Sequence, residues 1–194
     1  MNFLCRIEVR YNMKIKIKTS SIQHPAHGAV CSALAQHDDL IVLWGLPDSR
    51  TRLCCENSVN HIVGELKGYA KMFYCDEISD HEALIAKVLK ELRIESFKEF
   101  TDHMPSFDAR HPTWLVFESV DHLLPVPFFE HIIRQSRESG KFKLLVTTHS
   151  ADNAIHLLAK CNATVVKPID CCHWGEERGG RVGCPREYRR QSEV

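Results

Sequence analysis

Polar residues follow three of the apolar runs in this sequence, and they carry groups that could do chemistry. The first run leads into Gly45 and then into DSRTR at 48–52. The second ends at Glu118, and the third ends in TTHS at 147–150. A carboxylate can hold a metal ion or activate water, whereas hydroxyl, imidazole and guanidinium groups can bind phosphate oxygens. If the runs are parallel strands, these groups lie together at one edge of a sheet, where ligands bind.

Short apolar runs alternate with segments of helical spacing along most of the chain. Strands are expected at 40–44, 70–78, 113–119, 142–150 and 163–169. Helices are expected from about 51 to 66, from 80 to 94, from Pro127 to Gly140, and from 151 to 161. We expect loops or irregular chain at 20–30 and at 101–112. This alternation predicts an α/β fold, with a largely parallel sheet covered by helices on both faces.

The chain divides into three regions by pattern and composition. Residues 1–38 are expected to form an N-terminal strand or hairpin and a linker, because MKIKIKT alternates Lys14, Lys16 and Lys18 with apolar residues. Residues 39–170 form the α/β domain. Residues 171–194 are polar, glycine-rich and basic, and are expected to form a C-terminal tail.

The overall composition is that of an ordinary globular protein, and it narrows the classes of ligand. The 194 residues include 25 basic and 25 acidic side chains, so no net charge favours nucleic acid or an anionic membrane. The longest apolar run is far too short to span a bilayer, and the N-terminus lacks the pattern of a signal peptide. The nine cysteines are therefore expected to be reduced thiols in a cytoplasmic protein.

In order and spacing, four segments resemble the landmarks of the STAND P-loop NTPases, whose best-known branch is the NB-ARC module of plant immune receptors and apoptotic activators. The segments are LIVLWGLPDSRTRL, WLVFESVDHLL, KLLVTTHS and ATVVKPID, within 39–170. The resemblance implies a three-layer P-loop NTPase-like fold that binds ADP or ATP with Mg²⁺. It also implies a role in signal transduction or defence response and a protein partner in a signalling complex.

The phosphate loop departs from the family pattern Gly-x-x-x-x-Gly-Lys-Ser/Thr. Aligned from Gly45, the sequence has Arg50 at the second glycine, Thr51 at the lysine and Arg52 at the Ser/Thr. Asp48 would repel a phosphate charge about 4 Å away by roughly 4 kcal/mol at an effective dielectric of 20. A register shifted by one residue instead places Arg50 at the lysine and Thr51 at the Mg²⁺ ligand.

The other two motifs are altered as well. At the acidic motif, Glu118 occupies the position that orients Mg²⁺, and Ser119 replaces the acid that positions the attacking water. Asp121, two residues later, is interpreted as a helix cap or turn residue. In TTHS, His149 stands where the family has a phosphate-sensing arginine, and Thr147 is equally well explained as a strand-end hydroxyl.

These alignments define the candidate site. Glu118 is the catalytic candidate, and the metal ligands are Thr51 and Glu118. The candidates for nucleotide binding are Gly45, Asp48, Ser49, Arg50, Thr51, Arg52, Thr148 and His149. In the tail, Cys171, Cys172, His173 and Cys184 offer zinc ligands, but adjacent cysteines fit the usual spacing poorly, and incidental thiols are favoured.

The expected function is a degenerate ADP- or ATP-binding regulatory module with slow or no hydrolysis. Two alternatives stay open: an active motor ATPase of the packaging or helicase type, and an interaction scaffold that binds no nucleotide. Nucleic acid and membrane are not expected partners.

Overall fold

The computed structural model describes residues 26–36, 39–46, 50–123, 127–160 and 168–170. Within them lies one five-stranded sheet with the order β2-β3-β4-β1-β5. The strands are β1 (Leu40–Trp44), β2 (Tyr69–Tyr74), β3 (Thr113–Glu118), β4 (Lys143–Thr148) and β5 (Pro168–Asp170). Every pair of neighbouring strands is parallel. The predicted fold class is thus confirmed.

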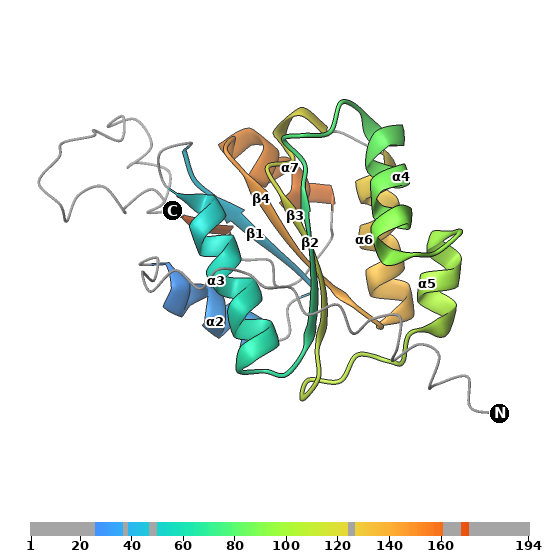
Figure 1. Ribbon diagram of the computed structural model, residues 1–194. Helices are drawn as coiled ribbons and strands as arrows, with labels where there is room; N and C mark the ends of the chain where they lie inside the picture. Colours follow the sequence, from blue (N-terminus) through green and yellow to red (C-terminus); the bar gives the residue numbers. More distant parts are fainter. Residues whose placement is uncertain (1–25, 37–38, 47–49, 124–126, 161–167, 171–194) are drawn as a thin grey trace, which may run out of the picture.

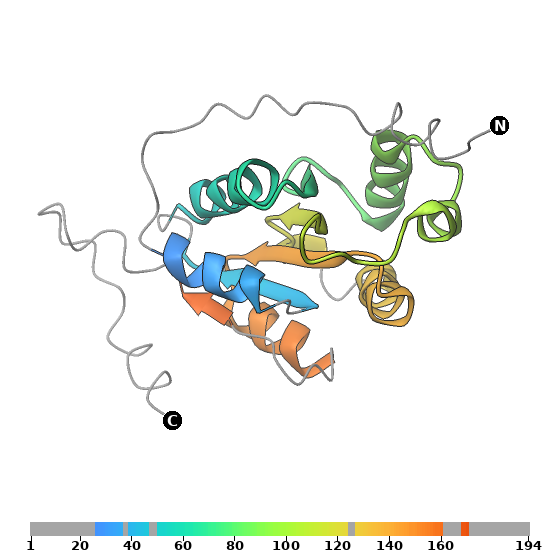
Figure 2. The ribbon, with the colours of Figure 1, turned by 90° about the horizontal axis from the view of Figure 1, so that it is seen from below.

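Helices cover both faces of the sheet (Figure 1). On one side lie α2 (His27–Ala35) and α3 (Thr51–Gly64), and on the other lie α4 (His81–Leu92), α5 (Phe97–His103) and α6 (Pro127–Ser139). Helix α7 (Ala151–Lys160) lies on the side of the sheet away from α3 (Figure 2). A short 3₁₀ helix, η2 (Asp121–Leu123), follows β3.

Alternating side chains of the strands build the two cores between these layers. In β1, Leu40 and Val42 join the core under α4 to α7, whereas Ile41 and Leu43 join the core under α2 and α3. A strand buried on both faces needs apolar residues at every position, which explains why LIVLW is an unbroken apolar run.

The described helices agree with most of the sequence expectations. Asp80 caps α4 by accepting a hydrogen bond from the backbone N–H of Ala83 at 2.9 Å, as its sequence suggested. Gly140 follows α6 with a φ of +58°, which is a conformation that favours glycine at a helix end. The expected hairpin in the first 25 residues and the C-terminal tail lie outside the described residues.

Two helices were not expected from the sequence. The segment expected to be a loop overlaps the first turn of α2, whose Val30, Ala33 and Leu34 are buried against the sheet and α3. Pro25 and Gly28 suggested a loop, but spacing of three and four residues between the buried side chains gives a helix its apolar face.

The other is α5, which ends inside the segment expected to be irregular. Ser96 caps it by accepting from the N–H of Glu99, and the Glu99 carboxylate accepts from the N–H of Glu95. The spacing Ser96-x-x-Glu99 is a helix-start signal that was available in the sequence.

Candidate functional site

The strand order brings the predicted strand ends together. Strand β4 pairs with β1 on one side and with β3 on the other. Beyond the last paired residues, the Gly45 N–H donates to the Thr148 carbonyl at 3.2 Å. On the other side, the Ser119 N–H donates to Thr147 Oγ1 at 2.8 Å. Thr147 is thus a satisfied strand-end hydroxyl, one of the two interpretations that the sequence left open.

The loop after β1 is described only at its two ends. Asp48 and Ser49 lie outside the described residues. Arg50 has a φ of 57° and immediately precedes α3, and its side chain makes no capping hydrogen bond to that helix. Thr51, the first residue of α3, is buried. The first N–H groups of a helix attract anions.

Glu118 is engaged by Arg52 from the first turn of α3. Its carboxylate oxygen Oε2 lies 2.9 Å from Arg52 Nη2, and the Glu118 side chain is only 3% exposed. The same Arg52 nitrogen lies 2.8 Å from Asp76 Oδ2, and the guanidinium lies over the Tyr74 ring. The hydrogen bond to Glu118 is the main cause that raises the pKa of Arg52 above its ordinary value, against the opposing effect of burial. Arg52 therefore stays charged and neutralises Glu118.

This contact bears on the register of the phosphate loop. In a working site, the Ser/Thr of the loop and the acid of the second motif hold the same Mg²⁺ and so lie close together. The structure brings Arg52 to Glu118, which favours the alignment that starts from Gly45, with Arg52 at the Ser/Thr position.

The groups around Glu118 do not fit a Mg²⁺ ion in this arrangement. Mg²⁺ prefers oxygen ligands, but the carboxylate here faces a guanidinium. A dication 4 Å from that guanidinium would be repelled by about 8 kcal/mol at an effective dielectric of 20, twice the value for two unit charges.

Asp121 is the most heavily hydrogen-bonded carboxylate at this edge. It accepts from the Thr148 hydroxyl, from the backbone N–H of His149 at 2.9 Å and of Ser150 at 3.1 Å, and from Asn153 Nδ2 at 3.1 Å. Burial alone would raise the pKa of Asp121, but these hydrogen bonds together hold it below its ordinary value. Asp121 thereby joins η2 to the turn between β4 and α7. We refer to this set of hydrogen bonds as the Asp121 network.

His149 connects the ends of β1 and β4. Its Nδ1 lies 2.9 Å from the Gly45 carbonyl, so the Nδ1 position carries the proton and donates. Thr148 is buried and donates to Asp121. Both predicted phosphate-binding residues thus take part in holding the strand ends in place.

Sequence reasoning identified Glu118 and the TTHS segment but gave too little weight to three residues. Asp121 was interpreted as a cap or turn residue, although it organises a long-range network. Asp76 and Tyr74, which surround Arg52, were not considered. The sequence pointed to these two residues only by their position, because Tyr74 ends β2 and Asp76 follows it, at the same edge of the sheet.

Solved structures share this architecture, whereas no protein-family model and no curated protein matches the sequence. Cdc6p from Pyrobaculum aerophilum matches with a TM-score of 0.54 and 12% identity, over 84% of this chain and 48% of that one. The Walker-type ATPase PABY2304 of Pyrococcus abyssi has a TM-score of 0.54 and 9% identity, over 84% of this chain and 57% of that one. The chain therefore has a P-loop NTPase-like fold.

A third similar structure is that of an assembly that contains DNA. The Drosophila ORC bound to GC-rich DNA and Cdc6 matches with a TM-score of 0.50 and 13% identity, over 87% of this chain and 63% of that one. The expectation that nucleic acid is not a partner gains no support from this comparison. The chain spans less than two thirds of each of these structures.

Within the part of the chain that the structure describes, no helix has the length and apolar character needed to cross a membrane.

Proposed function

We propose that this P-loop-fold chain is a degenerate ADP- or ATP-binding module that works as a regulatory or signalling unit and hydrolyses nucleotide slowly or not at all. The observation that carries the proposal is the ion pair between Arg52 and Glu118. It occupies the one carboxylate that the sequence offered for catalysis and for a metal.

Binding is supported by the position of α3. The helix begins beside the ends of β1 and β3, and Arg50 and Arg52 stand at its first residues. A phosphate there would meet the N-terminal end of a helix and an arginine side chain. The signalling role, the cytoplasmic location and a protein partner come from the NB-ARC resemblance and belong to the proposal.

Slow hydrolysis is supported by the groups next to Glu118. Ser119 cannot act as a general base. Its backbone has a φ of 62°, and its N–H donates a hydrogen bond to Thr147 Oγ1. Glu118 would have to leave Arg52 before it could position water or metal.

The test is nucleotide affinity measured by calorimetry, with and without Mg²⁺. We expect wild-type protein to bind ADP with an affinity that changes less than about threefold when Mg²⁺ is added, because Arg52 already balances Glu118. Arg50→Ala should weaken binding about tenfold, the effect of losing one charge-assisted hydrogen bond of about 1.4 kcal/mol. Asp48→Gly should tighten binding by removing a carboxylate. The matched control is Arg110→Ala, which removes an exposed arginine that is not part of the candidate site and should leave nucleotide affinity unchanged.

Two outcomes would replace the proposal. If no binding is seen at millimolar nucleotide, the chain is an interaction scaffold that keeps only the fold. If phosphate release depends on Mg²⁺ and is abolished by Glu118→Ala, the chain is an active ATPase and Arg52 leaves Glu118 during turnover.

A further inference from the structure

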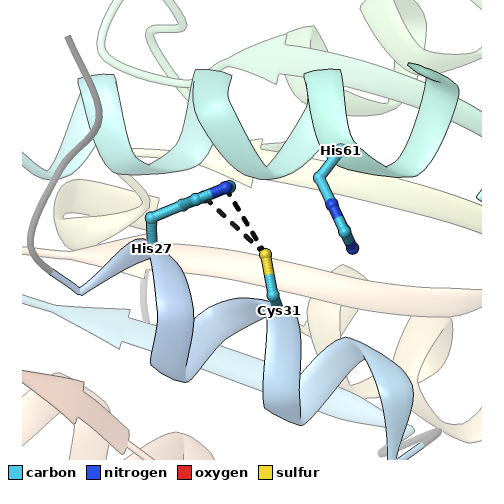
Figure 3. A group of neighbouring side chains, drawn as sticks. All are labelled: His27, Cys31 and His61. Atoms are coloured by element: carbon cyan, nitrogen blue, oxygen red, sulfur yellow. Dashed lines mark hydrogen bonds between the residues drawn. The ribbon is translucent and has the colours of Figure 1, made fainter. Parts of the chain in front are cut away.

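A cluster of two histidines and one cysteine lies between α2 and α3. His27 and Cys31 are four residues apart on α2, and His61 reaches toward them from α3 (Figure 3). All three side chains are partly buried, and one ligand atom of each lies within 4.8 Å of those of the other two.

The distances within this cluster are close to those of a metal site. In a tetrahedral zinc site, nitrogens at about 2.0 Å and a sulfur at about 2.3 Å from the ion lie roughly 3.3 to 3.6 Å from one another. The distance from Cys31 Sγ to His27 Nε2 is 3.5 Å, so this pair is already spaced as two ligands of one ion. Small side-chain rotations would bring His61 to the same spacing.

The backbone supports the same geometry. Residues i and i+4 of a helix lie one above the other on one face, which lets His27 and Cys31 converge on one ion. Helix α2 is fixed against α3 by buried apolar contacts, in which Val30 and Leu34 of α2 share a core with Val59 of α3. His61 therefore faces the α2 pair from a packed element.

A carboxylate, that of Glu65, lies next to the cluster. It stands four residues after His61 on the same side of α3, and its Oε2 lies 3.0 Å from His61 Nδ1. This contact does not have the geometry of a hydrogen bond, and His61 Nδ1 is a buried nitrogen without a hydrogen-bond partner among the described residues, so the ring keeps a nitrogen that a metal ion could satisfy. The Glu65 side chain is 72% exposed, so the cluster lies near solvent and an ion can enter.

We propose that His27, Cys31 and His61 bind one Zn²⁺ ion, with the Glu65 carboxylate close to His61 and a solvent molecule as the fourth ligand. Two imidazoles and one thiolate are ligands that zinc accepts, and the thiol proton is released when the ion binds. The ion would fasten α2 to α3. His61 comes ten residues after Thr51, about 15 Å along the helix, so the site is independent of the phosphate loop.

The same contacts could instead be a thiol hydrogen bond to His27 and an edge-to-face pair of the His27 and His61 rings, 5.9 Å apart. Metal titration separates the two explanations. The 194-residue protein is treated with chelator and then titrated with Co²⁺, followed by competition with Zn²⁺. We expect one Co²⁺ per chain, with strong visible bands of a tetrahedral ion and a thiolate-to-cobalt charge-transfer band, both displaced by Zn²⁺.

Variants locate the ion. Cys31→Ser should abolish the charge-transfer band, and His61→Gln should weaken zinc affinity by more than about 100-fold, since even changes behind the ligands cost about 10- to 100-fold. The control combines Cys171→Ser, Cys172→Ser and Cys184→Ser in the tail, and it should bind metal as the wild type does. Loss of binding in the control together with retention in Cys31→Ser would place the ion in the tail and overturn the proposal.

A measurement on unaltered protein covers the case in which a variant does not fold. Zinc should slow alkylation of Cys31 at least about tenfold, read by mass spectrometry of the peptide that contains it. Cys75 serves as the internal reference, because burial raises the pKa of its thiol to about 12 and keeps it unreactive with or without zinc. Equal alkylation of Cys31 with and without zinc, or no cobalt bands at all, would overturn the proposal.

Discussion

Two carboxylates at the same edge of the sheet, Glu118 and Asp121, are neutralised in different ways. Glu118 is paired with Arg52, a long side chain that is 48% exposed and also contacts Asp76. Asp121 is held by a hydroxyl, two backbone N–H groups and an amide. Side-chain partners can rotate away, whereas backbone donors are fixed by the fold. The comparison indicates that Asp121 is part of the framework, and that Glu118 keeps a partner that a ligand could replace.

The largest expected effect is that of removing the Asp121 carboxylate. Asp121→Ala should lower the free energy of unfolding by about 3 kcal/mol, because it leaves several donors of the Asp121 network without their charged acceptor. Urea denaturation at neutral pH measures this change. Asp152→Ala, at an exposed acid in the first turn of α7, should cost no more than about 0.5 kcal/mol. If the two changes lower the free energy of unfolding equally, the Asp121 network adds no stability of its own.

The Arg52–Glu118 pair should respond unequally when either partner is removed. Arg52→Met leaves the Glu118 carboxylate buried beside an apolar side chain, and should cost about 2 kcal/mol. Glu118→Gln should cost only about 1 kcal/mol, because Arg52 is partly exposed and retains Asp76. Urea denaturation of both variants and of the double variant gives the three values. A larger loss for Glu118→Gln would contradict the view that Arg52 is the movable partner.

The smallest effect is expected in the dependence of stability on pH. The pKa of Asp121 is below its ordinary value in the folded protein, so its ionised form stabilises the fold. This stability is fully present above the unfolded pKa of about 4 and is lost as the pH falls through the lower folded value. The stability difference between wild type and Asp121→Asn should therefore shrink between pH 5 and pH 3. Urea midpoints of the two proteins across this range test it.

The sequence predicted the sheet well because its signal is local. Unbroken apolar runs such as LIVLW and WLVF require burial on both faces, and each lies in a strand at the expected place. Of the two helices that were missed, α5 had a capping signal in its sequence, whereas α2 shows the limit of this reasoning. In α2, Pro25 and Gly28 indicated a loop, and only packing of Val30 and Leu34 on the sheet and α3 explains the helix.

The candidate site could be predicted only in part. Parallel strands must end at one edge, so the proximity of Gly45, Glu118 and Thr148 followed from the pattern. The sequence could not predict that Arg52 pairs with Glu118, because the two residues are 66 positions apart and either register of the loop was open. The same holds for His61, which meets Cys31 only through the packing of α2 on α3.

By itself, the sequence determined which segments are strands and which residues follow them. Local periodicity and residue chemistry are sufficient for these conclusions. Only the tertiary structure decided which charges meet. The order of the strands placed Arg52 against Glu118 and Asp121 beneath the turn after β4. Electrostatic interactions depend on distances in space, and the distance along the chain does not fix them.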